Sequence, residues 1–306
     1  MKSIVKLLLF VSFAANAQPG KEAWNWVMGS GSLFNFSTGV PVQTPFTGQT
    51  ISRMVSISDP NTGQLLFYAN GTTVWDKNNN PMPNGNISDA IEHIIAIPAP
   101  CSNKYYLIVL NYNKSIYYSI VDMSLRGGLG DITSKNVPLP NFPYLPKGDG
   151  VRHTNQRDYW FITHGDNSNT FYAYLINQNG ISSTPVISNV GSVLLTNYTY
   201  TNTPVTISYS LKASPNGKRL ALAHEDGSNN RIIEIYNFDN ATGLITNPIT
   251  LNSSQFWHDS YWLSFSPDNT KLYATFAYYS TFSISQFDLS SNNAATIQAS
   301  EYDGYI

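Results

Sequence analysis

Apolar and polar residues alternate along most of this chain, and short turns rich in Pro, Asn, Asp and Gly separate the alternating runs. A period of two places every second side chain on one face of an extended strand, whereas a helix needs a period near 3.6. A phrase made of a turn and then an alternating run recurs at DPNTGQLLFYAN (59–70), CSNKYYLIVL (101–110), TNQRDYWFITH (154–164), SPNGKRLALAH (214–224) and SPDNTKLYATF (266–276). The pattern predicts an all-β chain.

The phrase recurs about every 40 to 60 residues, which fits a unit of four antiparallel strands. Stacked units of this kind form a β-propeller. The innermost strands of the first three units should begin near Ile51, His93 and Gly150. The strands of the last two units are expected at 208–213, 218–223, 231–238 and around Ile249, and at 261–265, 270–276, 282–289 and 296–299.

About five blades of this size fit between residues 30 and 300. A propeller has to close, because an open ring leaves the flanks of its first and last blades uncovered. The tail 301–306 resembles the entry to another blade. We therefore expect a propeller truncated from a larger ring of six or seven blades, with a complete five-bladed ring as the alternative.

The first residues have the pattern of a secretory signal peptide. Lys2 and Lys6 precede an apolar run at 7–15, and Ala15-Asn16-Ala17 offers a cleavage site before Gln18. We expect a signal peptide at 1–17 and a propeller domain at 18–306, incomplete at its C-terminal side. No later segment reaches the ~20 apolar residues that span a bilayer. The expected location is extracellular or on the outer cell surface.

The composition narrows the partners. Charged residues make up 12% of the chain, the formal net charge is −2 and no basic run is present, so nucleic acid is not an expected partner. A surface built from Asn, Ser, Thr and Tyr suits neutral polar ligands such as sugars, and it equally describes an ordinary exposed β-surface. The single cysteine, Cys101, cannot form an intramolecular disulfide, and its turn position favours an inert thiol.

Three segments carry a resemblance to a known family: 58–68, Met123-Ser124-Leu125 followed by Gly-Gly-Leu-Gly-Asp at 127–131, and 157–174. They resemble the N-terminal β-propeller of secreted Bacteroidetes proteins of the gliding-motility-associated, type IX secretion kind, in the quinoprotein-dehydrogenase-like or YVTN-type superfamily. The resemblance implies a secreted, surface-displayed propeller. It also implies that the rest of a longer polypeptide, with a C-terminal sorting domain, is missing here, and it implies no particular reaction.

Histidines supply the first candidate site. Alignment of the repeats without gaps puts His164 and His224 at the same position, the end of the second strand, while His93 and His258 lie near the starts of innermost strands. Those two places share one face of a propeller, and loops at such a face commonly bind ligands. The alternative is that these are structural histidines with satisfied hydrogen bonds.

Aromatic residues supply the second part of the site. Trp257 and Tyr261 fall beside predicted loops, where they could stack on sugar rings. Packing between blades is the alternative use of such aromatics. The predicted ligand-binding residues are therefore His164, His224, His258, Trp257 and Tyr261.

No cofactor or metal is expected. No histidine pair has the spacing of metal ligands. The oxygen-rich segments 59–63 and 266–269 lack the alternating acidic positions of a calcium site and indicate turns, and Gly127-Gly128-Leu129-Gly130 indicates a loop that needs positive φ rather than a phosphate loop.

The sequence favours a non-enzymatic binding or adhesion module with a glycan or protein ligand. The alternative is a secreted polysaccharide hydrolase or lyase that uses His164, His224 and His258 as acid–base groups.

Overall fold

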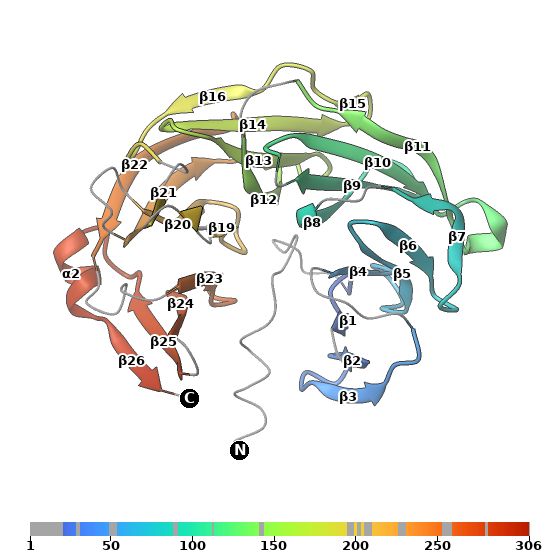
Figure 1. Ribbon diagram of the computed structural model, residues 1–306, viewed down its shortest axis with the longest axis horizontal. Coiled ribbons are helices and arrows are strands. Elements are labelled where there is room, and N and C mark those ends of the chain that lie inside the picture. The colour runs from blue at the N-terminus through green and yellow to red at the C-terminus, as the bar shows by residue number, and fades with distance from the viewer. Residues whose placement is uncertain are drawn as a thin grey trace.

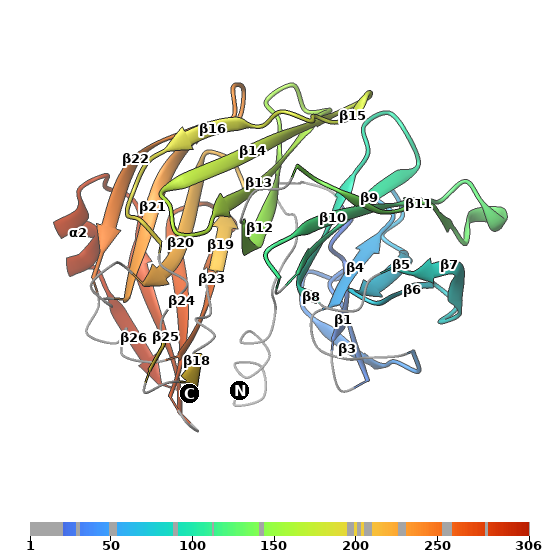
Figure 2. The same ribbon diagram turned by 45° about the horizontal axis from the view of Figure 1, so that its top comes forward.

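The computed structural model describes residues 21–28, 31–48, 54–87, 91–111, 113–140, 144–194, 199–200, 203–204, 210–225, 231–252, 259–278 and 281–305. Within them the chain forms seven antiparallel sheets, six of which follow one another around a central axis in chain order (Figure 1). The fold is a six-bladed β-propeller. The view in Figure 2 shows the same succession of sheets from a second direction.

The first three blades use the N-terminal half of the chain. Blade 1 contains β1 (Asn25–Met28), β2 (Ser32–Asn35) and β3 (Val42–Pro45). Blade 2 contains β4 (Met54–Ser58), β5 (Leu65–Asn70), β6 (Thr73–Asp76) and β7 (Pro81–Asn86). Blade 3 contains β8 (Ile91–Pro98), β9 (Lys104–Asn111), β10 (Ile116–Asp122) and β11 (Asp131–Pro138).

The last three blades repeat this plan. Blade 4 contains β12 (Tyr144–Arg152), β13 (Tyr159–Gly165) and β14 (Thr170–Asn177), and its outer position is shared by β15 (Gly180–Ile181) and β16 (Val186–Asn189), which both pair with β14. Blade 5 contains β19 (Ser210–Ala213), β20 (Arg219–Glu225), β21 (Arg231–Asp239) and β22 (Leu244–Leu251). Blade 6 contains β23 (Asp259–Phe265), β24 (Lys271–Tyr278), β25 (Thr281–Asp288) and β26 (Tyr302–Tyr305).

Four short elements lie outside the sheets of the blades. The strands β17 (Thr199–Tyr200) and β18 (Thr203–Pro204) pair with each other. The 3₁₀ helix η2 (Arg126–Gly128) connects β10 to β11, and the helix α2 (Ala294–Ala299) precedes β26. No helix of the described residues is long and apolar enough to cross a membrane.

The predicted blade count is wrong. About five blades of a truncated ring were expected, but six are present, and the additional sheet is blade 1. Its three strands have only four residues each, too short for the alternation to stand out. Blade 1 packs on blade 2 through Asn25, whose backbone N–H and side-chain amide both donate to the Ser58 hydroxyl, at 3.2 and 3.0 Å.

The end of the last blade also differs from the expectation. Residues 296–299 were expected to form its fourth strand, but they belong to helix α2. The Asn293 side chain caps this helix by accepting the Thr296 N–H at 3.0 Å, and Ile297 is buried beneath it. The tail 301–306 was expected to enter another blade, whereas its strand β26 pairs with β25 and is the outer strand of blade 6.

The innermost strands confirm the predicted repeat. β8, β19 and β23 begin within three residues of the expected positions, and β12 begins at Tyr144, six residues before Gly150. The turns also follow the prediction, since Gly63, Gly217 and Asn269 have φ of 75°, 65° and 65°. In the glycine-rich segment after β10, all three glycines have positive φ.

The core consists of the seams between neighbouring blades. Alternate residues of one strand enter opposite seams: Leu220 and Leu222 pack toward blade 4, while Ala221 and Ala223 pack toward blade 6. Both faces of a strand such as β20 are therefore buried, which explains why it contains few polar residues. Cys101 is exposed and free, so no disulfide involves it.

Candidate functional site

The two ends of the propeller axis carry different polar groups. Innermost strands finish, and second strands begin, at the end where Arg152 lies, and we call this the arginine end. Second strands finish at the opposite end, which we call the histidine end because His164 and His224 lie near it. The innermost strands β4, β8, β12, β19 and β23 surround the centre of the ring in Figure 1.

The structure brings His164 and His224 together, but in a buried seam. On β13, His164 has the same orientation as Trp160 and Ile162, which pack toward blade 5. On β20, His224 has the orientation of Leu220 and Leu222, which pack toward blade 4. Both histidines are 1% exposed.

Glu234, on β21, is the centre of this seam. Its carboxylate accepts five hydrogen bonds: from His224 Nε2 at 2.9 Å, the Tyr236 hydroxyl at 2.6 Å, the Ser192 N–H and hydroxyl at 3.1 Å each, and the Thr250 hydroxyl at 3.2 Å. Burial by itself would raise the pKa of Glu234, but the bonds from His224 and Tyr236 outweigh it and lower the pKa to about 2. The carboxylate is therefore ionised and fully engaged within the protein.

His164 is held beside this group in its neutral form. Its Nδ1 lies 2.7 Å from the carbonyl oxygen of Gly165, so Nδ1 carries the proton. The pKa of His164 is lowered to about 4, mainly by burial and to a smaller extent by His224, while the Gly165 bond and Glu234 oppose the change. Nε2 is buried and has no hydrogen-bond partner.

Three predicted site residues are less fully placed. Trp257 and His258 lie outside the described residues. Tyr261 lies in β23, but its side chain is not described. Of the site predicted at the histidine end, the structure thus shows the side chains of two histidines. Sequence reasoning missed Glu234, which lies on β21 and bonds to His224 and to Thr250 of β22. A single Glu at an inward position of the apolar run at 231–239 is the signal that could have found it.

Further polar side chains lie on the innermost strands or next to them. Asp149 on β12 forms an ion pair with Lys212 on β19 at 3.0 Å, and it accepts the Ala213 N–H at 2.9 Å. His93 on β8 has an Nδ1 that is buried and without a partner. Burial, with Lys147 and Lys212, lowers the pKa of His93 well below its usual value. At the end of β9, the side-chain oxygen of Asn111 is also buried and without a partner.

The arginine end holds a second group of polar residues, which the sequence did not single out. Glu22 precedes β1, Arg152 ends β12, and Tyr105 and Tyr159 lie near the starts of β9 and β13. Both charged side chains are partly exposed, but Oε2 of Glu22 and Nε of Arg152 are buried and without partners. The guanidinium carbon of Arg152 is 5.8 Å from the centre of the Tyr159 ring.

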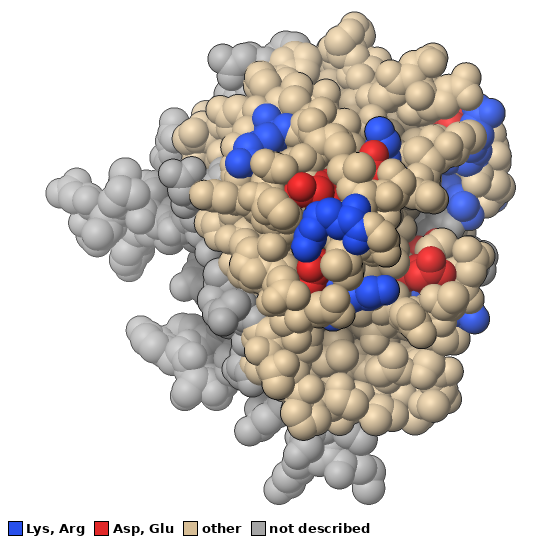
Figure 3. All heavy atoms as spheres, turned by 90° about the vertical axis from the view of Figure 1, so that its right-hand side faces the viewer, with Lys and Arg blue, Asp and Glu red and all other residues tan. Residues whose placement is uncertain are grey.

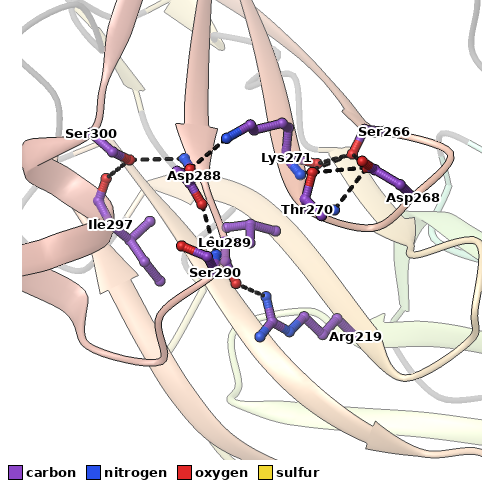
Figure 4. A network of polar contacts seen from close by, with 10 residues as sticks. All are labelled: Arg219, Ser266, Asp268, Thr270, Lys271, Asp288, Leu289, Ser290, Ile297 and Ser300. Carbon is purple, nitrogen blue, oxygen red and sulfur yellow. Dashed lines mark hydrogen bonds and ion pairs between the residues drawn. The ribbon is translucent and has the colours of Figure 1, made fainter.

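The oxygen-rich segments use their oxygens inside the chain. Asp268 Oδ1 accepts hydrogen bonds from the Ser266 hydroxyl at 2.6 Å and from the Thr270 hydroxyl and N–H at 2.9 and 3.1 Å (Figure 4). Asp59 Oδ1 makes the equivalent bonds to Asn61 and Thr62. Both segments are Asx turns, as predicted. In the described part of the chain, no three His, Cys, Asp or Glu residues are placed to hold a metal ion.

One side of the molecule carries positive and negative charges mixed together. Figure 3, which views the right-hand side of Figure 1, shows Lys and Arg beside Asp and Glu on a mostly uncharged surface. Pairs such as Lys104–Asp122 at 3.2 Å and Arg126–Asp76 at 3.5 Å mix the two signs. A pocket of about 280 Å³ between β10, β11 and Tyr144 has no charged residue in its lining. Neither the mixed surface charge nor the uncharged pocket indicates a binding site for a charged polymer.

The sequence matches no family model and no curated protein. Solved structures are similar in fold. The periplasmic gluconolactonase PpgL of Pseudomonas aeruginosa aligns over 86% of this chain and 74% of its own, with a TM-score of 0.51 and 11% identity. The β-propeller domain of Cps50 (Swd1) from Myceliophteria thermophila aligns over 90% of this chain and 86% of its own, with a TM-score of 0.50 and 11% identity. At this identity the similarity shows the propeller fold alone.

Proposed function

We propose that this propeller is a glycan-binding module, secreted or held at the cell surface, that captures its ligand at an end of the axis without changing it chemically. The supporting observation is a set of buried polar atoms without partners, on Glu22, His93, Asn111, Arg152 and His164. Buried polar atoms nearly always have a partner, so unmatched atoms mark places that water or a ligand completes. All five lie near one end of the axis or the other.

A hydrolase or lyase has less support. Glycoside hydrolysis uses two carboxyl groups on either side of the scissile bond, one of them able to give a proton. Near the histidine end, Glu234 has a pKa lowered to about 2, so it cannot give a proton at neutral pH, and it accepts five hydrogen bonds. Asp166 forms an ion pair with Lys114. Both carboxylates serve the seams between blades, which favours binding over catalysis.

The proposed location rests on the signal pattern at 1–17 and on the family resemblance. Export should remove these residues and leave Gln18 as the first residue. N-terminal sequencing of the protein from the culture medium or cell surface tests this step, and a product that still begins at Met1 would contradict it.

A glycan array tests the function. The secreted protein should bind a limited group of glycans, and chromatography should recover those glycans intact after incubation. Binding to no glycan would overturn the proposal, even if a protein partner were found. Shortened or unsaturated products would return the protein to the hydrolase or lyase class.

A further inference from the structure

Glu22 and Arg152 are anchored through their backbones, and each side chain has one buried polar atom without a partner. The carbonyl oxygen of Glu22 accepts the Ser58 N–H at 2.9 Å, which fixes this residue against the end of β4. The carbonyl oxygen of Arg152 accepts the Asn240 side-chain amide at 3.3 Å. Despite this fixed setting, Glu22 Oε2 and Arg152 Nε remain buried without partners. Such atoms cost free energy unless something completes their hydrogen bonds.

The two charges do not neutralise each other by direct contact. No ion pair joins them among the described residues, yet both act on Tyr159, which lies between blades 3 and 4. Burial raises the pKa of Tyr159, Arg152 opposes this through its charge and a side-chain hydrogen bond, and the charge of Glu22 adds to the rise. Burial and Glu22 also raise the pKa of Tyr105.

Geometry places the same four residues together. Glu22 is bound to Ser58 at the end of β4, the nearby Phe67 ring contacts the Tyr105 ring with centres 5.4 Å apart, and Arg152 lies 5.8 Å from the centre of the Tyr159 ring. Since β4, β8 and β12 are neighbours around the axis, Glu22 and Arg152 border the same end of the ring, together with two tyrosine hydroxyls that stay protonated at neutral pH.

This group combines an acceptor, a donor and two hydroxyls that can do both. A ligand hydroxyl donates to a carboxylate and accepts from a guanidinium, so a molecule with several hydroxyls can meet all four residues. The opposite charges of Glu22 and Arg152 disfavour a ligand with a strong net charge. The nonpolar face of a sugar ring can also lie against the tyrosine rings.

We infer that the arginine end holds a binding site for a neutral sugar, bridged by Glu22 and Arg152 and bordered by Tyr105 and Tyr159. This inference rests on the proposed function and locates it at the end of the axis opposite the predicted histidines. Because cleavage is expected before Gln18, Glu22 remains in the exported chain.

Calorimetric titration of the secreted protein with the methyl glycosides of glucose, galactose and mannose tests the site, with glycine as a zwitterionic probe. Glu22→Gln and Arg152→Met should each weaken binding of the preferred glycoside about tenfold or more, as expected for a hydrogen bond to a charged group. The matched control is Arg157→Met. Arg157 lies at the same end, but its guanidinium is held by Asp158 at 2.9 Å. This control should change the affinity less than about twofold.

The outcomes separate the site from the function. A protein that binds glycosides with unchanged affinity after both Glu22→Gln and Arg152→Met would overturn the site and leave the proposed function intact. Glycine that binds more tightly than every glycoside would overturn the sugar assignment. Equal melting temperatures for the variants and the parent protein are required before a loss of affinity counts in favour of the site.

Discussion

The two ends of the propeller use buried charge in opposite ways. Near the histidine end, the carboxylate of Glu234 receives five hydrogen bonds and connects blades 4 and 5. At the arginine end, Glu22 and Arg152 have buried atoms without partners although their backbones are fixed. A fully matched charge contributes to the fold, whereas an unmatched one lowers stability until a ligand arrives. The difference separates the seam around Glu234, where the neutral His164 also has a buried atom without a partner, from a candidate binding site formed by charged groups.

The largest expected effect is at the structural seam. Glu234→Leu should lower the free energy of unfolding by about 3–5 kcal/mol, because His224, Tyr236 and Ser192 lose a buried partner at once. Urea unfolding measures the change. Glu301→Gln, which alters a partly exposed glutamate of blade 6, is the control and should cost less than about 1 kcal/mol. A loss for Glu234→Leu as small as that of the control would remove the contrast between the ends.

The next effect is a pH dependence of the same seam. The pKa of His164 is lowered from about 6.5 in the unfolded chain to about 4 in the fold, so the unfolded chain binds more protons in this interval. Stability from this group is complete above pH 6.5 and is lost as the pH falls toward 4, by about 3 kcal/mol in all.

His164→Asn should remove this share of the acid sensitivity, whatever its effect at neutral pH. Unfolding free energies measured at pH 7 and pH 4.5 give the slope for both proteins. His93 remains as a second acid-sensitive group, so the slope should shrink rather than vanish. An unchanged slope would mean that His164 accepts a proton in the folded state as readily as in the unfolded chain.

A smaller effect is expected where one half-buried arginine connects two blades. Arg219 donates to the Leu289 carbonyl oxygen and to the Asn292 side chain, both at 2.9 Å, and so connects blade 5 to blade 6 (Figure 4 shows the first bond). Arg219→Met should lower stability by about 1–2 kcal/mol. The matched variant Lys218→Met changes the exposed neighbour and should have no measurable effect, and equal losses for the two would contradict a connecting role.

The smallest effect on stability is expected at the arginine end. Arg152→Met removes a charge whose Nε has no partner, so the free energy of unfolding should change by less than about 1 kcal/mol, in either direction. Thermal melting without sugar measures this. A loss comparable to that of Glu234→Leu would show that Arg152 supports the fold, and the two ends would then be alike.

The sequence predicted most blades because each one combines a turn of fixed chemistry with an alternating run, as at 214–224 and 266–276. It missed blade 1, whose strands are too short for a period of two to be recognised. It also missed helix α2, because six residues hold too few turns to show a helical period. The local sequence pattern is thus enough to predict the long strands, whereas the short elements depend on packing against their neighbours.

The candidate site was only partly predictable. The equivalent positions of His164 and His224 follow from the repeat, and the structure places both in one seam. The seam around them also contains Ser192 and Glu234, which lie outside the repeated phrases at 154–164 and 214–224 and so could not be found from the repeat. Glu22 and Arg152 lie where charged residues are common, at a turn and a strand end, so only the fold reveals that they share a space.

The order of the strands has a consequence for how the chain acquires its fold. Every blade is made of consecutive strands, and each strand pairs with a neighbour in sequence or, in blade 4, with one a single strand further along. The backbone pairing is therefore local in sequence, which favours fast folding compared with sheets that join distant segments. A chain that emerges progressively from a ribosome or a translocation channel can complete blade 2 before blade 5 has appeared. The seam that contains Glu234 forms late in such a sequence, since Thr250 is contributed only when β22 is in place.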